Sequence, residues 1–278
     1  MRTVAIVGVG LIGASFGLAL RKSGFKGPIL GVSSRRAMEA GLATGAVSAA
    51  ATLKEAAEQA DLIYLAQPVD GIIDTLGWLG PMARKETLVT DAGSTKSAIV
   101  AAATASLRNA RFIGGHPMAG KETRGAQSAD ANLFRNRLYV LTPQASPVPE
   151  HFLQLLENMG ANVLEMTAED HDATVALTSH LPQLISTALA AFLSNRKEPG
   201  IEQVFGSGLL DMTRLALSPV ELWSSILATN KANVLQGIDL YTQALAELKQ
   251  AVQADDLDSI FKAAAQFAAN LRKPDPPA

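Results

Sequence analysis

Short apolar, β-branched runs alternate with helical patterns through the first half of the chain. The runs predict strands near residues 3–7, 29–33, 62–66, 87–91, 111–114, 138–142 and 162–165, with helices between most of them. Strands that alternate with helices are typical of a parallel sheet covered by helices. We therefore expect an α/β fold, a doubly wound parallel sheet, over residues 1–165.

After about residue 166 the strand pattern ends. The sequence 166–278 is rich in Ala, Leu and Gln at helical spacing, and it predicts an all-α C-terminal domain. Helix starts are indicated at Thr52-Leu53-Lys54-Glu55, Thr167-Ala168-Glu169-Asp170 and Ser218-Pro219-Val220-Glu221. Gly24 and Gly45 are expected helix stops, and the proline-rich end 273–278 is expected to fray.

The composition of the chain excludes several classes of function. Hydrophobic residues make up 48% and charged residues 18%, which suits a large core, and a net charge of −2 gives no basic footprint for nucleic acid. The absence of cysteine excludes disulfides, thiolate metal sites and cysteine nucleophiles. The apolar stretch 175–193 is interrupted by polar residues, and residues 2–7 are too short for a signal peptide. We expect a soluble, cytoplasmic protein without membrane partners.

The first expected strand leads into a glycine-rich loop. The sequence Gly8-Val9-Gly10-Leu11-Ile12-Gly13 follows Val4-Ala5-Ile6-Val7 and opens a helix that runs to about residue 23. Gly8 permits the tight turn, Gly10 lets the backbone approach a pyrophosphate, and Gly13 lets helix and strand pack closely. Leu11 and Ile12 start a helix whose free N–H groups face the phosphates. A purely structural turn is the alternative.

The end of the second expected strand indicates which dinucleotide is bound. NAD enzymes usually carry an acidic residue there for the ribose 2′-hydroxyl. Here Ser33, Ser34 and Arg35 follow the strand, so hydroxyls and a guanidinium could bind a 2′-phosphate, which favours NADP. The alternative is a solvated helix start with surface arginines. Gln67 and Pro68 end the third strand and are expected near the nicotinamide half.

Two candidate catalytic residues follow expected strands. His116 lies in Gly114-Gly115-His116-Pro117, just past the strand, where small neighbours leave room for a ligand. A histidine there is well suited to accept a proton near neutral pH. Ser94 follows the fourth strand; its hydroxyl could orient the substrate or the histidine, or it could simply cap a helix.

Two further polar residues lie in apolar, helical surroundings. His180 is either a core histidine or a residue lining a cleft between domains, and its spacing from His171 does not suit a shared metal, so we expect no metal site. Arg214 needs a partner, which is either Asp211 three residues earlier or a substrate carboxylate, and the pattern alone favours Asp211.

Several motifs occur in order along the chain: G-V-G-L-I-G at Gly8, D-A-G-S-T-K at Asp91, G-H-P-M-A-G at Gly115, S-H-L-P at Ser179, and D-M-T-R-L-A with S-P-V-E-L-W between Asp211 and Trp223. In these motifs the chain resembles the prephenate/arogenate dehydrogenases of tyrosine biosynthesis, over nearly its whole length. The resemblance implies a Rossmann domain followed by a helical domain that forms a homodimer.

The resemblance also implies roles for site residues. His116 would accept the proton of the C4 hydroxyl during an oxidative decarboxylation, and Ser94 would lie beside that hydroxyl. His180 would line the site, Arg214 would bind a substrate carboxylate, and Glu122 would form a polar wall. The cofactor accepts the hydride, and no metal is needed.

One position departs from the family pattern. Members that use prephenate often carry a second histidine three residues after the first, where this chain has Gln183. Gln183, together with the residues after the second strand that favour NADP, favours arogenate over prephenate as the substrate. One alternative is a β-hydroxyacid dehydrogenase, but the G-x-x-G-x-x-K-type helix of that family is not found in the sequence. Another is an NADP-sensing regulator, which would not need His116 and Arg214.

Overall fold

The computed structural model describes residues 1–144 and 147–272, so the expected fraying of 273–278 lies outside the described residues. By its internal contacts the chain divides into two compact units, Met1–Lys231 and Ala232–Ala278. The first unit contains the sheet and the helices up to Thr229. The second contains most of α11 (Lys231–Gln253) and all of α12 (Asp258–Asn270).

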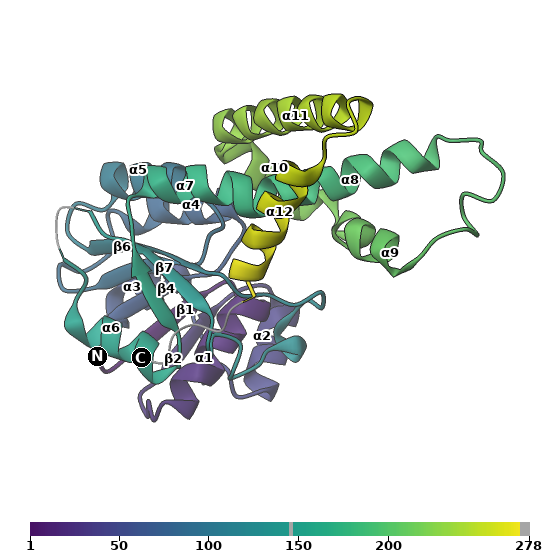
Figure 1. Ribbon diagram of the computed structural model, residues 1–278. Coiled ribbons are helices and arrows are strands. Elements are labelled where there is room, and N and C mark those ends of the chain that lie inside the picture. Colours follow the sequence, from purple (N-terminus) through teal and green to yellow (C-terminus); the bar gives the residue numbers. More distant parts are fainter. Residues whose placement is uncertain (145–146, 273–278) are drawn as a thin grey trace. The chain divides into compact units, whose positions relative to one another are not determined.

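An eight-stranded sheet forms the centre of the first unit (Figure 1). Its strands are β1 Val4–Val7, β2 Ile29–Val32, β3 Ala49–Ala50, β4 Leu62–Leu65, β5 Leu88–Asp91, β6 Arg111–Pro117, β7 Leu138–Thr142 and β8 Asn162–Glu165. They lie in the order β3-β2-β1-β4-β5-β6-β7-β8. The pairs are parallel except for β6 and β7, which run antiparallel. This is the expected doubly wound sheet, which starts with Rossmann strand order.

The sheet departs from the sequence prediction at three places. The short β3 was not expected, because two alanines carry no strand pattern. β6 continues to Pro117, so His116 lies inside the strand and not after it. β7 runs antiparallel because residues 118–137 return from the same edge of the sheet with one short 3₁₀ turn, Ala126–Ser128, and no crossover helix.

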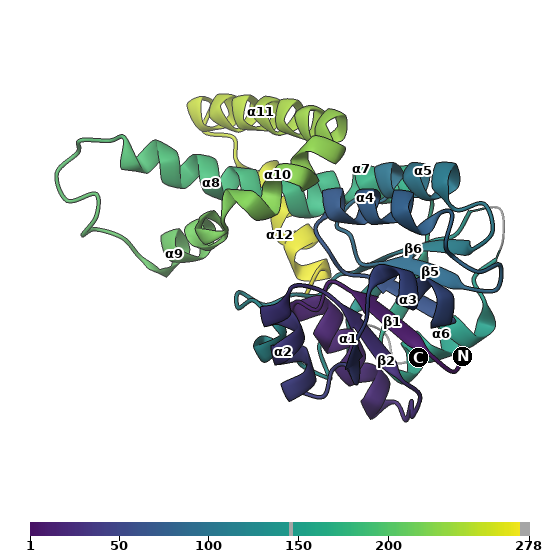
Figure 2. The ribbon, with the colours of Figure 1, turned by 180° about the vertical axis from the view of Figure 1, so that it is seen from behind.

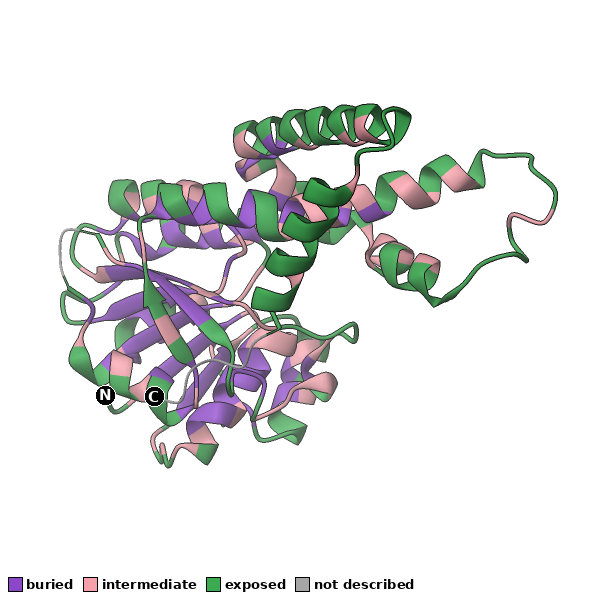
Figure 3. Ribbon diagram, viewed as in Figure 1, coloured by how far each residue is buried: buried purple, intermediate pink, exposed green. Residues whose placement is uncertain are grey.

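Helices cover both faces of the sheet (Figures 1 and 2). Residues Val4 and Ile6 of β1 belong to a core cluster shared with α1 (Leu11–Lys22), α2 (Arg35–Ala43) and α6 (Glu150–Asn158). Ala5 and Val7 belong to a second cluster shared with α3 (Leu53–Gln59), α4 (Val69–Leu79) and α5 (Ser97–Ser106). The residues of the central strands β1, β4 and β5 are all buried (Figure 3), as expected for a parallel sheet between helices, whereas the edge strands β3 and β8 are mostly exposed.

The expected helix ends are largely confirmed. Thr52 caps α3 in a complete capping box with Glu55, and Gly24 and Gly45 follow α1 and α2 with φ of +93° and +74°. α10 (Val220–Thr229) begins one residue later than expected, with Pro219 at its cap position. The sequence signals therefore located these ends to within one residue.

After β8 the secondary structure of the described residues is all helical, with a loop between residues 194 and 207. A helix runs from α7 (Ala168–Val175) through a π-helical segment, Ala176–His180, into α8 (Leu181–Ser194). The wider turn lies next to Pro182, which has no N–H to donate, and α8 begins there as expected. By length and composition alone the stretch Ala168–Ser194 could span a membrane, a test that the core helix of a soluble protein also passes. α9 (Ser207–Thr213) and a 3₁₀ turn, Arg214–Leu217, precede α10.

Candidate active site

The turn from β1 into α1 has the shape of a dinucleotide-binding loop. Gly8 has φ +95°, and a Cβ atom there would lie 2.7 Å from the carbonyl carbon of Ala66. A Cβ atom on Gly13 would lie 2.1 Å from the carbonyl oxygen of Gly8, so helix and strand require glycine at both positions. Around Gly10 there is open space within 4 Å of an added Cβ, which leaves room for a bound pyrophosphate.

The first turn of α1 completes this loop. Leu11 and Ile12 are half-buried and pack against the core, while Gly10 at the cap position receives no side-chain hydrogen bond. The N–H groups at the start of this 12-residue helix are therefore not occupied by a capping side chain. The residues present fit the phosphates of a dinucleotide cofactor.

The residues expected to select the cofactor lie exposed after β2. The Ser34 hydroxyl accepts a hydrogen bond from the Ala37 N–H and so caps α2, and Ser33 is exposed beside it. Arg35 pairs with Glu39 at 2.9 Å on the surface, its side chain 94% exposed. An exposed pair of this kind is weak, which leaves the guanidinium available to a ligand.

Gln67 and Pro68 follow β4, beside the glycine loop. Gln67 accepts a hydrogen bond from the Thr75 hydroxyl at 3.0 Å, and Pro68 occupies the cap position of α4. A Cβ atom on Gly8 would also come within 2.9 Å of the Gln67 backbone nitrogen. Both residues therefore lie at the carboxyl edge of the sheet, as the sequence predicted.

A buried ion pair joins β5 to β6 at this edge. Lys96 and Asp91 are fully buried and bonded to each other. Asp91 also accepts from the N–H of Gly93 at 2.8 Å and of Gly115 at 3.0 Å. The Lys96 ammonium donates to the Gly115 carbonyl at 2.7 Å. Because Gly115 precedes His116, the pair fixes the backbone that carries the histidine.

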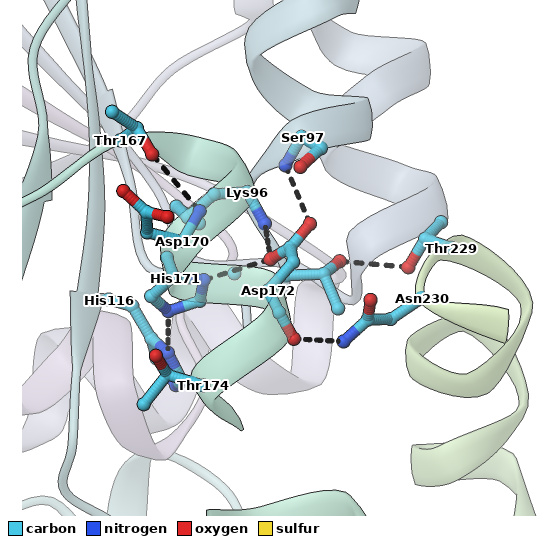
Figure 4. Close-up of polar contacts among 12 residues, drawn as sticks. Lys96, Ser97, His116, Thr167, Asp170, His171, Asp172, Thr174, Thr229 and Asn230 are labelled. Atoms are coloured by element: carbon cyan, nitrogen blue, oxygen red, sulfur yellow. Dashed lines mark hydrogen bonds and ion pairs between the residues drawn. The ribbon is translucent and has the colours of Figure 1, made fainter. Parts of the chain in front are cut away.

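His116 is partly exposed and hydrogen-bonded through one ring nitrogen. Its Nδ1 lies 2.9 Å from Nε2 of His171 on α7 (Figure 4), and among the described residues nothing bonds its Nε2. Desolvation lowers the pKa of His116 well below its usual value, and His171, Lys96 and His180 act in the same direction, while Asp172 opposes them. The imidazole is therefore neutral near pH 7 and has a free nitrogen that can accept a proton.

Ser94 does not cap a helix. α5 begins at Ser97 with Lys96 at its cap position, so the capping alternative for Ser94 was wrong. Two backbone N–H groups there, those of Lys96 and Ser97, instead donate to the Asp172 carboxylate at 2.7 and 2.8 Å. Within residues 1–144 and 147–272 the Ser94 hydroxyl has no hydrogen-bond partner, and its side chain is half-buried.

His180 is a core histidine in this structure. It is 1% exposed, packs edge-on against Trp223 with ring centroids 5.8 Å apart, and lies 3.3 Å from the side-chain nitrogen of Asn230. Desolvation lowers its pKa to about 4, helped by His171 and opposed by Asp172. The buried indole nitrogen of Trp223 has no hydrogen-bond partner among the residues that the structure describes. No group of metal-ligating residues occurs in the described parts of the chain.

Arg214 pairs with Glu122 and not with Asp211. The two side chains meet at 3.2 Å and are 57% and 82% exposed, so the expectation of a local Asp211 partner was wrong. Gln183 is buried on α8, and its amide nitrogen donates to the Leu215 carbonyl at 2.8 Å. Gln183 thus holds the 3₁₀ turn that carries Arg214.

Four residues at this site were given no role by the sequence analysis: Asp91, Lys96, Asp172 and Asn230. Their partners are distant in sequence; the Lys96 backbone bonds a residue 76 positions away. The available signal was the run Asp170-His171-Asp172, three ionisable residues in succession at the start of the helical half. Buried charges of this kind need partners, which predicts a network but not its members.

Comparisons with known proteins fit this arrangement. Family models described as "Prephenate dehydrogenase, nucleotide-binding domain" and "Prephenate dehydrogenase, dimerization domain" match residues 16–165 and 167–266. A prephenate dehydrogenase of Lactococcus lactis is 32% identical, over 94% of this chain and 74% of its own length.

Two solved structures share the fold along nearly the whole chain. Prephenate dehydrogenase from Aquifex aeolicus, in complex with hydroxyphenyl propionate and NAD+, has a TM-score of 0.88 and 29% identity, and 97% of each chain is covered. Synechocystis arogenate dehydrogenase has a TM-score of 0.82 and 30% identity, over 97% of this chain and 98% of that one. The chain therefore belongs to the prephenate dehydrogenase family, with a nucleotide-binding domain followed by a dimerization domain.

Proposed function

We propose that this family member catalyses the oxidative decarboxylation of L-arogenate to L-tyrosine with NADP+, and that His116 is the general base. The observation that carries the proposal is the unbonded Nε2 of a partly exposed, neutral histidine at the carboxyl edge of the sheet. A base must be neutral and within reach of the proton that it takes. The family rules against the β-hydroxyacid dehydrogenase alternative.

The reaction needs few groups from the protein. His116 accepts the proton of the C4 hydroxyl as the hydrogen on C4 leaves with its bonding electrons. The electrons of the bond to the ring carboxylate enter the ring, CO₂ departs, and the phenolic oxygen recovers the proton. A bound nicotinamide supplies the hydride acceptor. Ser94, whose hydroxyl is unpaired, would hold the C4 hydroxyl against His116.

Arg214 is the proposed anchor for a substrate carboxylate. Its guanidinium is more than half exposed and, within residues 1–144 and 147–272, shares only one hydrogen bond, with Glu122, so most of its donors are available. An arginine fork matches a carboxylate well. Glu122 would form a polar wall beside it, and His180, held by Trp223 and Asn230, would support the floor of the site.

Gln183 favours arogenate over prephenate. Its amide nitrogen must face the Leu215 carbonyl, because that oxygen can only accept, so Oε1 is the other amide atom. In the described parts of the chain the amide bonds of Gln183 are made by its nitrogen, to Thr187 and Leu215, and nothing donates to this oxygen. A free acceptor suits the ammonium group of arogenate, while prephenate carries a keto group at that position and offers it no donor.

The test of the substrate is NADPH absorbance with arogenate and prephenate supplied separately. We expect a higher kcat/KM on arogenate, and we expect Gln183→His to shift the ratio towards prephenate. Gln203→His, which adds a histidine at an exposed position, is the matched control and should leave the ratio unchanged. An equal or higher kcat/KM on prephenate for the unmodified protein would contradict the arogenate proposal.

The choice of NADP rests on Ser33, Ser34 and Arg35, the exposed residues after β2. Arg35→Ala should raise the KM for NADP+ much more than that for NAD+, because only NADP+ has a 2′-phosphate for the guanidinium to bind. Arg108→Ala removes an exposed arginine at the opposite edge of the sheet and should change neither KM. A native preference for NAD+, or equal losses for both cofactors, would contradict the proposal.

A further inference from the structure

Three ionisable side chains form a continuous hydrogen-bonded row that ends at His116. The Asp172 carboxylate lies 2.8 Å from Nδ1 of His171, and Nε2 of His171 lies 2.9 Å from Nδ1 of His116 (Figure 4). His171 and Asp172 are neighbours on α7, whereas His116 is on β6. His171 and Asp172 are 0% and 1% exposed, so only the His116 end of the row meets solvent.

The aspartate end of the row is fixed as a hydrogen-bond acceptor. The Asp172 carboxylate accepts backbone N–H groups from Lys96 and Ser97 at the start of α5, in addition to His171. Burial alone would raise the pKa of Asp172, but the hydrogen bonds from His171, Ser97 and Lys96 outweigh burial and lower it. The carboxylate is therefore ionised at neutral pH and has no proton to donate.

This polarity determines the tautomer of both histidines. Because Asp172 can only accept, Nδ1 of His171 must carry a proton and donate it. A neutral His171 then has an unprotonated Nε2, which can only accept, so Nδ1 of His116 must donate to it. The proton of neutral His116 is thereby held on Nδ1, and its Nε2 keeps a lone pair.

We infer that His171 and Asp172 are positioning residues that hold His116 in the tautomer and orientation a general base requires. The inference rests on the proposed function, in which Nε2 of His116 takes the substrate proton. Without an acceptor at Nδ1, the imidazole could carry its proton on Nε2, where it cannot act as a base, and the ring could rotate about its side-chain bonds. A carboxylate that orients a catalytic histidine in this way is a recurrent arrangement in enzymes.

Further hydrogen bonds, made by Asn230 and Lys96, hold the backbone around the row in place. Asn230 donates its side-chain N–H to the backbone carbonyl of Asp172 at 2.7 Å, which ties α7 to the end of α10. Lys96 holds the backbone of Gly115 beside His116. Asp172 therefore also has a structural role at the start of α5, so a loss of function in an Asp172 variant would be ambiguous.

His171 gives the sharper test, because two substitutions separate its two hydrogen bonds. In His171→Gln the longer side chain can present an amide oxygen to Nδ1 of His116 and so replace the acceptor. In His171→Asn the shorter amide can remain on Asp172 but cannot reach His116. We expect His171→Gln to keep most of kcat and His171→Asn to lose roughly 10- to 100-fold, with the KM for cofactor unchanged in both.

A spectroscopic measurement distinguishes positioning from general damage. Multiple-bond ¹⁵N–¹H NMR spectra of imidazole-labelled protein report which nitrogen of His116 carries the proton, with His116→Asn used to assign the signal. We expect the Nδ1–H form in the unmodified protein and in His171→Gln. In His171→Asn we expect a mixture that contains the Nε2–H form, at an unchanged melting temperature.

The outcomes separate this inference from the proposed function. If His116→Asn remains active, the proposed base is wrong. If His116→Asn is inactive while His171→Asn keeps both full kcat and the Nδ1–H form, the base stands and the positioning role is overturned. If His171→Asn lowers the melting temperature, both variants are measured at a temperature below their melting transitions. The kcat and the His116 tautomer of His171→Asn are then compared with those of His171→Gln. Equal kcat and equal tautomers in the two variants would then refute the inference.

Discussion

Neutral His116 implies a particular pH dependence at the scale of the single residue. Burial and the neighbouring Lys96, His171 and His180 lower its pKa well below 6.5. Protonation removes the base, so kcat/KM falls only when the pH drops through this lowered pKa. We expect no acidic limb at pH 6.5 in a profile of kcat/KM, and a fall at clearly more acidic pH.

The acidic limb of the kcat/KM profile is expected to contain a second group, and a His116 variant tests the assignment of the base. His180, whose pKa is about 4, protonates in the same acidic range, so the limb is expected to contain both groups. His116→Asn should lose roughly 10²–10⁴-fold in kcat, as is typical when a positioned base is removed, and should change the acidic limb. A limb centred at or above 6.5, or an unchanged limb in His116→Asn, would show that another group is the base.

Arg214 should contribute to substrate binding and not to cofactor binding. A charge-assisted hydrogen bond contributes about 1.5–3 kcal/mol. We therefore expect Arg214→Ala to raise the KM for substrate roughly 10- to 100-fold in steady-state assays, with the KM for NADP+ unchanged. Because Arg214 is more than half exposed, the substitution should leave the melting temperature close to that of the unmodified protein. Unfolding of this variant would instead indicate a structural pair with Glu122.

Residues whose roles follow from local chemistry were predictable from the sequence. The conformational demands on Gly8 and Gly13 follow from the turn itself, and His116 could be assigned to the ligand edge from its place after an apolar run. Partners across the fold were not predictable. Arg214 bonds Glu122, 92 residues away, although Asp211 is three residues away, and the regular helix that a local i, i+3 pair assumes ends at Thr213, before the 3₁₀ turn that begins at Arg214.

At the scale of elements, apolar periodicity located the long strands and helices but not their pairing. The antiparallel direction of β7 depends on the absence of a crossover helix from the connection 118–137, which the hydrophobic pattern did not reveal. The π-helical segment Ala176–His180 was likewise not predicted, although Pro182 marked the start of α8. This segment contains His180, so its wider turn sets where that buried ring lies.

Helix α7 carries two residues of the row, so its cap provides an element-scale prediction. The Thr167 hydroxyl accepts the Asp170 N–H at 3.0 Å, which satisfies one free donor of the first turn. Thr167→Ala should lower the free energy of unfolding by about 1 kcal/mol in urea titrations. Thr167→Asn, which retains a capping oxygen, should remain close to the unmodified protein. Equal stability of the alanine and asparagine variants would show that the cap contributes nothing.

At the scale of the whole molecule, the helical half leaves many large apolar side chains exposed. Among the described residues of α11 and α12 these include Leu235, Leu240, Leu245, Val252, Phe261 and Phe267. Exposed apolar side chains that gather on one surface often mark a protein–protein contact. The family model that spans residues 167–266 is described as a dimerization domain. Burial between two copies of the chain would account for both observations.

We therefore expect a homodimer, measured by light scattering at micromolar concentration as twice the mass of one chain. Phe261 on α12 is 64% exposed, and Phe261→Asp should shift the mass towards that of a single chain, because burying a carboxylate in an apolar interface is costly. Trp78 on α4 is 69% exposed but lies outside the dimerization domain, so Trp78→Asp is the matched control and should remain dimeric. A single-chain mass for the unmodified protein would refute the dimer, and a dimeric Phe261→Asp would exclude Phe261 from its interface.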